Sequence, residues 1–276
     1  MQITELSPVL GAEVAGVDLR TPLGAAQVDE LRATYERHHL LVLHDQDLSG
    51  EQQVAFASHF GPLVIENAAW GYVSNVRPDG IVREGALLFH SDFAFAREPT
   101  RAISLHALEV PDDGAPTLFA SAVRAAARLP VELRSQLEGR DVLNIYDFGW
   151  PDDTRVREHQ LAPGSPRSAH PALGRHPVLD VAVPYANRMH TDRVIGLAEE
   201  RSEALLDALF GVLYADDNIY EHRWRVGDVV LWDNVALHHG RRDIPLDQPR
   251  TLQRVALGRH TPTELVPNLA QLLGRA

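Results

Sequence analysis

Apolar positions in the first sixty residues form two different patterns. From Val28 to His38 they recur at the spacing of a helix, and the unbroken apolar run 40–43 that follows is typical of a buried strand. Ser49 and Gln52 fit a capping box, which predicts that a second, short helix begins there. The chain therefore opens with a helix, a strand and a further helix.

Strands dominate the rest of the chain, although helical stretches interrupt them. Strands are predicted over 103–108, 117–119, 224–226, 229–232 and 252–257. Turn sequences at 111–114 and 227–228 predict hairpins between the first two and between the third and fourth of these strands. Helices are predicted over 122–137, with Pro130 starting a second one, and over 199–213. This order suits an antiparallel sandwich or barrel, and the lack of a Gly-rich strand-to-helix fingerprint disfavours nucleotide cofactors.

Two long segments, 63–87 and 151–168, show no sustained period. Structureless loops of this length are uncommon in a compact domain and often serve as lids or binding loops. We therefore predict a single domain over 1–276 that carries two lid loops. The first of these loops leads directly into His90.

Composition narrows the classes of function. The 276 residues contain 38 acidic and 26 basic side chains, a formal net charge of −12, so a nucleic-acid or anionic-membrane surface is not expected. The chain has no cysteine, which excludes disulfides and thiolate ligands and leaves nitrogen and oxygen ligands for any metal. No secretory signal or membrane-spanning run is present, so we expect a cytoplasmic protein with a small-molecule substrate, and homo-oligomerisation stays open.

A metal site is indicated by His90 and Asp92, which stand two positions apart. In an extended chain such residues point to the same face and can bind one ion together. The third ligand must come from a distant segment, and the pair His238-His239 is the best source. Neighbours on a strand face opposite ways, so only one of the two would enter the site.

Two histidines and one carboxylate leave three positions of an octahedron open, which suits non-haem iron(II), although zinc can use the same ligands. Arg250 and Arg254 lie 11 and 15 positions after His239 on the next predicted strand and share a face of it. A buried arginine requires an anion, and its planar fork matches a carboxylate. The arginines thus point to an anionic ligand beside the metal.

In four blocks the sequence resembles the taurine dioxygenase and 2,4-dichlorophenoxyacetate dioxygenase (TauD/TfdA) family of iron(II)/2-oxoglutarate oxygenases. The resemblance extends from about Gly11 to Arg259. The blocks are the opening segment 11–19, His90-Ser-Asp92-x-x-Phe95, Gly114-x-x-Thr117-Leu-Phe119, and Trp224-x-x-Gly-Asp-x-x-x-Trp-Asp-Asn234. It implies a mainly β fold with inserted helices on a double-stranded β-helix, or jelly-roll, core.

The resemblance also implies roles for single residues. His90, Asp92 and His239 match the iron ligands, because the family's distal histidine stands five positions after the Asn of Trp-Asp-Asn. Arg250 and Thr117 match the residues that bind the distal carboxylate of 2-oxoglutarate. Arg254 matches a second pocket arginine that contacts either the substrate or the cosubstrate.

The substrate pocket is expected to be lined by seven side chains: Asn67, Trp70, Tyr72, Phe93, Phe95, Asn187 and His190. Taurine enzymes carry a sulfonate-binding histidine before the first ligand, whereas this chain has none between His59 and His90. The resemblance therefore does not extend to taurine as the substrate.

The implied activity is an Fe(II)-, O₂- and 2-oxoglutarate-dependent dioxygenase that hydroxylates an unactivated C–H of a small anionic or amino-acid-like molecule and releases succinate and CO₂. A desaturating or ring-forming oxidase of the same family is the alternative. Two rivals come from other classes, a zinc hydrolase, which would need a general base beside the ion, and a non-catalytic jelly-roll binding protein.

Overall fold

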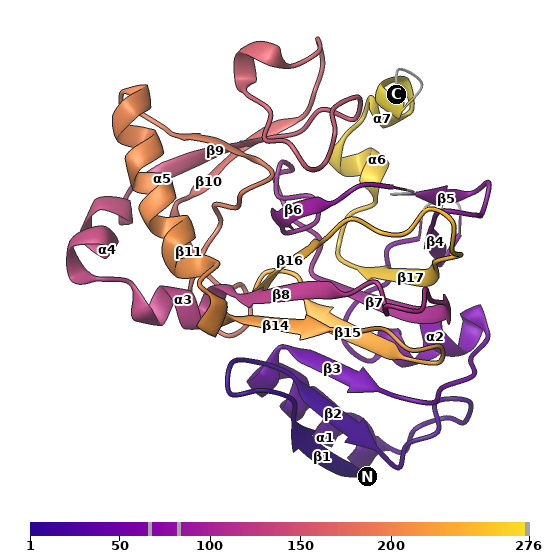
Figure 1. Ribbon diagram of the computed structural model, residues 1–276. Helices are drawn as coiled ribbons and strands as arrows, with labels where there is room; N and C mark the ends of the chain where they lie inside the picture. The colour runs from indigo at the N-terminus through magenta and orange to yellow at the C-terminus, as the bar shows by residue number, and fades with distance from the viewer. Residues whose placement is uncertain (66–67, 82–83, 274–276) are drawn as a thin grey trace.

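The computed structural model describes residues 1–65, 68–81 and 84–273. Within these ranges, two sheets at the centre of the molecule carry most of the strands (Figure 1). The larger sheet has the order β1 (Gln2–Glu5), β2 (Ala12–Ala15), β3 (Leu40–Leu43), β15 (Val229–Asp233), β7 (Ala102–Glu109), β17 (Thr251–Leu257), β4 (Gly71–Ser74) and β5 (Gly80–Ile81). The smaller has the order β14 (Ile219–His222), β8 (Thr117–Ser121), β16 (Leu237–Arg241) and β6 (Leu87–His90).

Helices and two minor sheets surround this centre. The minor sheets have the orders β10 (Arg167–Pro171), β9 (Asp141–Ile145), β13 (Thr191–Val194), and β11 (Leu173–Arg175), β12 (Ala182–Pro184). The helices are α1 (Ala25–His38), α2 (Gly50–Ser58), α3 (Ala122–Arg128), α4 (Val131–Leu137), α5 (Glu199–Leu213), α6 (Pro262–Leu265) and α7 (Leu269–Leu273), with 3₁₀ turns at Glu158–Gln160 and Asp216–Asn218.

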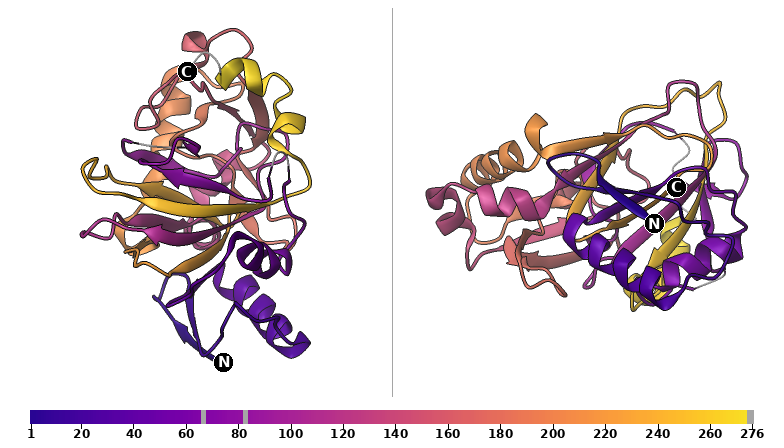
Figure 2. Two further views of the ribbon diagram at one scale, coloured as in Figure 1. Left: turned by 90° about the vertical axis from the view of Figure 1, so that its right-hand side faces the viewer. Right: turned by 90° about the horizontal axis from the view of Figure 1, so that it is seen from below.

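Alternation along the strands produces two apolar layers. In β15, Val230 and Trp232 pack between the two main sheets, whereas Val229 and Leu231 pack on the opposite face, which α1 and α2 cover. A third core joins α3, α4 and α5 to the minor sheets at one side of the molecule (Figure 1). Figure 2 shows the N-terminal strands with α1 at one end and the C-terminal helices at the other. The mainly β, jelly-roll fold with inserted helices is thus confirmed.

Several local predictions are confirmed as well. The run 40–43 is the fully buried strand β3, and α5 spans the predicted 199–213. The Ser49 hydroxyl accepts from the Gln52 backbone N–H while the Gln52 side chain accepts from the Ser49 N–H, which is the predicted capping box. The stretch 122–137 forms two helices that divide at Pro130.

Both predicted hairpins are wrong. The strand before the 111–114 turn, β7, lies in the larger sheet, whereas β8 after it lies in the smaller one. Similarly, Gly227-Asp228 separates β14 from β15, which lie in different sheets, and 224–226 forms no strand. Gly114 and Gly227 do adopt the positive φ of turn glycines, at 77° and 87°. Such turns reverse the chain, but in a sandwich the reversed chain can cross to the facing sheet.

The loop predictions need correction in part. The segment 63–87 is not continuous loop, because it contains β4, which pairs along its whole length with β17, and β5. The segment 151–168 is irregular except for a 3₁₀ turn and the start of β10. It is nevertheless anchored, since Arg155 and Arg157 both form ion pairs with Glu203 of α5. Whether either segment acts as a lid stays a prediction.

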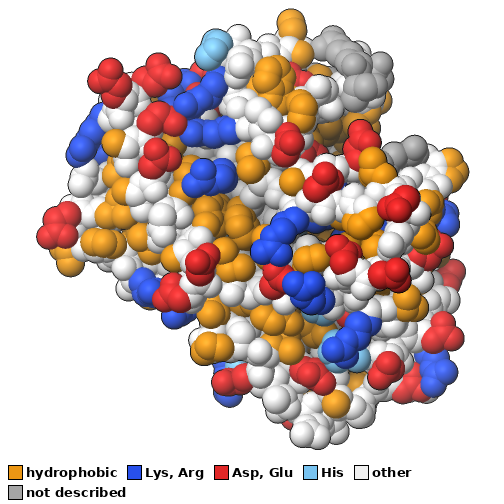
Figure 3. Space-filling view, viewed as in Figure 1, with side chains coloured by type: hydrophobic (Ala, Val, Ile, Leu, Met, Phe, Trp, Pro, Cys, Tyr) orange, Lys and Arg blue, Asp and Glu red, His pale blue; other side chains and the backbone are white. Residues whose placement is uncertain are grey.

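The surface mixes charges of both signs. Acidic and basic side chains are interspersed, with apolar atoms between them, on the face drawn in Figure 3. Within the described ranges, no helix has both the length and the apolar character needed to cross a membrane.

Candidate metal centre

His90, Asp92 and His239 meet at the edge of the smaller sheet. His90 is the last residue of β6, and His239 lies directly opposite it in the neighbouring strand β16. The Nε2 atoms of His90 and His239 lie 3.2 Å and 3.5 Å from one carboxylate oxygen of Asp92. One ligand atom from each residue falls within 4.8 Å of the other two, so a single ion can contact all three.

Strand alternation separates His239 from His238. His239 faces His90, with 4.2 Å between ring centroids, whereas His238 points the other way and its Nδ1 lies 2.9 Å from the Tyr214 hydroxyl. Burial lowers the pKa of His238 to about 3. His238 is therefore a neutral buried histidine on the far face of β16.

Contacts with neighbouring groups position Asp92 and orient His90. The Asn234 amide accepts from the Asp92 N–H at 2.8 Å and donates to the Asp92 and Thr100 carbonyls. His90 Nδ1 lies 2.8 Å from the Leu88 carbonyl oxygen, which leaves Nε2 directed at Asp92. Such outer contacts are what hold metal ligands in place.

The ligand set fits Fe(II). Burial and the nearby His90 lower the pKa of His239 to about 4, so its ring is neutral at pH 7, the form that binds metals. Burial acts to raise the pKa of Asp92, but hydrogen bonds from the two histidines outweigh it, and the carboxyl stays ionised. The second Asp92 oxygen lies 2.7 Å from Arg254 Nη2, which places Arg254 beside the candidate metal.

A buried guanidinium to which no described residue offers a carboxylate lies nearby. Arg250, directly before β17, is 3% exposed, and its Nε has no hydrogen-bond partner among the described residues. Burial and the nearby Arg241 lower its pKa to about 9, so it is still charged at pH 7. Arg241 lies opposite Thr117 in the β16–β8 pairing and donates to the Glu84 and Gly85 carbonyls. A buried charge of this kind is costly unless an anion joins it, which fits a carboxylate of 2-oxoglutarate.

Part of the predicted pocket does lie beside the histidines. The His190 ring stands 5.7 Å from His90 and 5.1 Å from Phe95, and Phe93 stands 5.3 Å from Phe95. Asn187 is buried and accepts a hydrogen bond from the His190 N–H, so it shapes the turn that presents His190.

Trp70 and Tyr72 lie elsewhere, which corrects the expectation that they line the pocket. The Trp70 indole packs against Gly50 of α2, where an added Cβ would lie 2.5 Å from the ring, and joins the core under the helices. Its N–H donates to the Tyr72 hydroxyl at 3.3 Å. The alternation of β4 turns Val73 into the core between the sheets and its neighbour Tyr72 to the opposite face. Asn67 lies outside the described residues.

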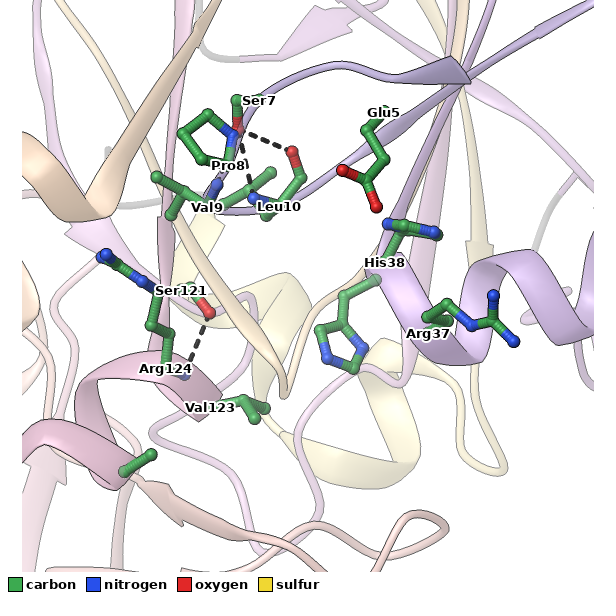
Figure 4. Close-up of a pocket in the computed structure, with 12 residues that line it drawn as sticks. Glu5, Ser7, Pro8, Val9, Leu10, Arg37, His38, Ser121, Val123 and Arg124 are labelled. Carbon is green, nitrogen blue, oxygen red and sulfur yellow. Dashed lines mark hydrogen bonds between the residues drawn. The ribbon is translucent and has the colours of Figure 1, made fainter. Parts of the chain in front are cut away.

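Sequence reasoning missed a second part of the aromatic wall. Tyr146 stacks on Phe95 at 4.9 Å, Phe148 packs on Tyr146 at 4.8 Å, and the C-terminal residues Val266 and Leu269 complete the cluster. The closely spaced aromatic residues over 145–150 could have predicted this part of the wall. A separate cavity of about 230 Å³, between 5–10 and the ends of α1 and α3, is lined by none of the predicted site residues (Figure 4).

A jelly-roll core that presents two histidines on adjoining strands and a carboxylate in the turn after one of them is typical of non-haem iron oxygenases. The family model "Taurine catabolism dioxygenase TauD, TfdA family" matches residues 2–256, and the chain belongs to this family. Its members depend on Fe(II), 2-oxoglutarate and O₂, so the protein is an oxidoreductase, and the zinc-hydrolase and binding-protein alternatives are set aside.

Similar proteins support this assignment. The chain is 32% identical over 267 residues to the alpha-ketoglutarate-dependent 2,4-dichlorophenoxyacetate dioxygenase of Cupriavidus pinatubonensis, covering 86% of this chain and 91% of the relative. It is 31% identical to the (S)-phenoxypropionate/alpha-ketoglutarate-dioxygenase of Sphingobium herbicidovorans, over 91% and 92% of the two chains. A solved structure of AAD-2 in complex with Mn(II) and N-oxalylglycine superimposes with a TM-score of 0.78 at 27% identity, covering 95% of this chain and 98% of the other.

Proposed function

We propose that His90, Asp92 and His239 bind the iron, that Arg250 and Thr117 bind the distal carboxylate of 2-oxoglutarate, and that the enzyme hydroxylates a C–H of a small organic anion. One observation carries the proposal. The ligand atoms of His90, Asp92 and His239 lie within 4.8 Å of one another beside the sheet that carries Arg241 and Thr117, and Arg250, close to Arg241, is buried without an acidic partner among the described residues.

When bound, iron and 2-oxoglutarate supply the oxidising chemistry, in which O₂ is consumed and 2-oxoglutarate is converted to succinate and CO₂. The protein holds and orients the reactants. The imidazoles of His90 and His239 and the ionised Asp92 would provide the lone pairs, and the aromatic wall of Phe93, Phe95 and Tyr146 would keep water from the reacting carbon. A carboxylate at position 92, where related halogenases have a small residue, favours hydroxylation over halogenation.

Arg254 is the proposed contact for the substrate's anionic group. Its guanidinium already lies at the metal centre, 2.7 Å from Asp92, and five N–H donors leave capacity for a second anion. The two relatives above are named for phenoxy-substituted carboxylates, and an aromatic wall faces the same space here. Aryl-substituted carboxylates are therefore the first substrates to test, with amino-acid derivatives, sulfonates and sulfates after them.

We also propose that 1–276 forms one domain. The family model covers 2–256, and α6 and α7 beyond it pack against Phe95, so the C-terminal segment forms part of the wall of the site.

The test is a substrate screen with the Fe(II)-loaded enzyme that measures succinate above the uncoupled background and identifies the oxidised product. We expect substrate-dependent succinate and a product heavier by one oxygen atom or, where the hydroxylated carbon bears an aryl ether, the phenol and oxo acid into which that hemiacetal breaks down. A product that has lost two hydrogens instead would indicate desaturation or ring formation. No succinate with any substrate, and no effect of 2-oxoglutarate on the iron spectrum, would contradict the proposal.

A further inference from the structure

The Thr117 hydroxyl makes one hydrogen bond within the described part of the chain. Its Oγ1 accepts from the Trp224 indole N–H at 2.9 Å, and both side chains are buried, at 5% and 3% exposure. An indole N–H can only donate, whereas a hydroxyl has one hydrogen and two lone pairs. The contact therefore occupies a lone pair of Thr117 and leaves its hydrogen for a different acceptor.

No described residue accepts that hydrogen. Across the β8–β16 pairing Thr117 lies opposite Arg241, whose guanidinium offers donors only, and the buried Arg250 lies close to Arg241. Among the described residues, the Thr117 hydroxyl hydrogen therefore has no acceptor, and Arg250 has no acidic partner. A carboxylate bound between Thr117 and Arg250 would accept the hydroxyl hydrogen and pair with the guanidinium.

The Trp224 indole is itself held in place. Its backbone N–H donates to the Gly114 carbonyl at 3.0 Å, and the His222 ring packs edge-on against it at 4.6 Å. His222 Nε2 lies 3.1 Å from Asp228, whose other oxygen lies 2.5 Å from His44 Nδ1. The Trp224 backbone is thus tied to Gly114 and its ring packs against a held His222, so turning the indole away from Thr117 would break the ring contact.

From this geometry we propose that Trp224 is a positioning residue for the cosubstrate. By donating to Thr117 it orients the hydroxyl so that Thr117 donates to the distal carboxylate of 2-oxoglutarate. The inference rests on the proposed role of Thr117, and it adds a residue that does not touch the cosubstrate itself.

The test is a double-mutant cycle on the full-length protein loaded with Mn(II), in which calorimetry measures the Kd of 2-oxoglutarate. We expect Trp224→Phe and Thr117→Val each to raise Kd by about 10-fold, the loss of one hydrogen bond to a charged group. The double variant should match Thr117→Val alone, because Trp224 acts through the hydroxyl. Binding of 2-oxopentanoate, which lacks the distal carboxylate, should be the same in all four proteins.

Trp70→Phe is the matched control. It also removes an indole N–H donated to a hydroxyl, but on the face of the larger sheet under α2, and it should leave the Kd of 2-oxoglutarate unchanged. If Trp224→Phe does not fold, as judged by circular dichroism, Trp224→Met replaces it in the cycle.

The possible failures are distinguishable. If Thr117→Val leaves Kd unchanged, the proposed carboxylate site is wrong and the inference fails with it. If Thr117→Val weakens binding but the Trp224 variants do not, or if the two effects add, Thr117 binds the cosubstrate without Trp224 and only the inference is overturned. Equal weakening of 2-oxopentanoate would show that Trp224 merely packs the core.

Discussion

Arg250 carries a positive charge in a buried position where the described residues offer it no acid. Arginine suits such a place because its planar fork pairs with both oxygens of a carboxylate, which lysine cannot do. We predict that Arg250→Lys raises the Kd of 2-oxoglutarate by at least about 10-fold. Calorimetry on the Mn(II)-loaded protein measures this, and Mn(II) affinity should not change. Unaltered 2-oxoglutarate affinity would mean that the carboxylate binds elsewhere.

Site residues were predictable from the sequence where they stand a few positions apart in a recognisable motif. His90 and Asp92 stand two apart, and the resemblance to the family, whose distal histidine stands five positions after the Asn, selected His239 over its neighbour. The Trp224–Thr117 contact was not predictable, because it joins residues 107 positions apart. Trp70 and Tyr72 were placed wrongly because the register of β4 decides which face they occupy, and no period in the sequence revealed that strand.

At the scale of elements, the connection between β15 and β16 depends on Asp233. Its carboxylate accepts from the Val235 and Ala236 N–H groups and lies within hydrogen-bond distance of Arg101 and His176. Burial acts to raise the pKa of Asp233, but the hydrogen bond from His176 and the charge of Arg101 lower it to about 2.

A carboxyl whose pKa is lower in the folded than in the unfolded protein stabilises the folded state at any pH above its unfolded pKa. This stabilisation is lost as the pH falls through the pKa of the folded protein. The difference between 3.8 and about 2 corresponds to roughly 2 kcal/mol in the free energy of unfolding. We predict that Asp233→Asn loses about this amount at pH 7 and that the deficit shrinks as the pH falls from about 4 to 2. Urea unfolding at several pH values measures it, and a deficit independent of pH would contradict the assignment.

Asn234, the next residue, connects that turn to the loop of Asp92. We predict that Asn234→Ala weakens Fe(II) binding by about 10- to 100-fold, because the Asp92 backbone loses both of its contacts to the amide. Anaerobic equilibrium dialysis measures the affinity. Asn218→Ala is the matched control, since Asn218 is also buried and donates to two carbonyls but lies away from the triad. Equal losses in both variants would point to general destabilisation.

Helices and strands were predictable largely because each is set by its own local pattern, a helical period for α5 and an unbroken apolar run for β3. The assignment of strands to sheets was not, because the turns at Gly114 and Gly227 carry the chain from one sheet to the other. Which sheet a strand joins depends on partners far away in the sequence.

At the scale of the whole molecule, ion pairs tie the segment 151–168 to α5. Glu203 is only partly exposed and pairs with Arg155 and Arg157. We predict that Glu203→Gln makes this segment more susceptible to limited proteolysis, and that high salt has a similar effect on the unaltered protein. Glu200→Gln, an exposed position on the same helix, is the charge-matched control. Equal cleavage of all three proteins at every salt concentration would show that the segment is held by other contacts.

Because the chain belongs to the TauD/TfdA family, whose members depend on Fe(II), the central claim is which residues bind the iron. The most direct measurement is an anaerobic Fe(II) titration, followed by addition of 2-oxoglutarate, on the unaltered protein, His239→Ala and His238→Ala. We predict that the unaltered protein and His238→Ala bind one Fe(II) whose visible spectrum changes with 2-oxoglutarate, and that His239→Ala loses both properties. Retention of both by His239→Ala, or their loss in His238→Ala alone, would contradict the proposed metal centre.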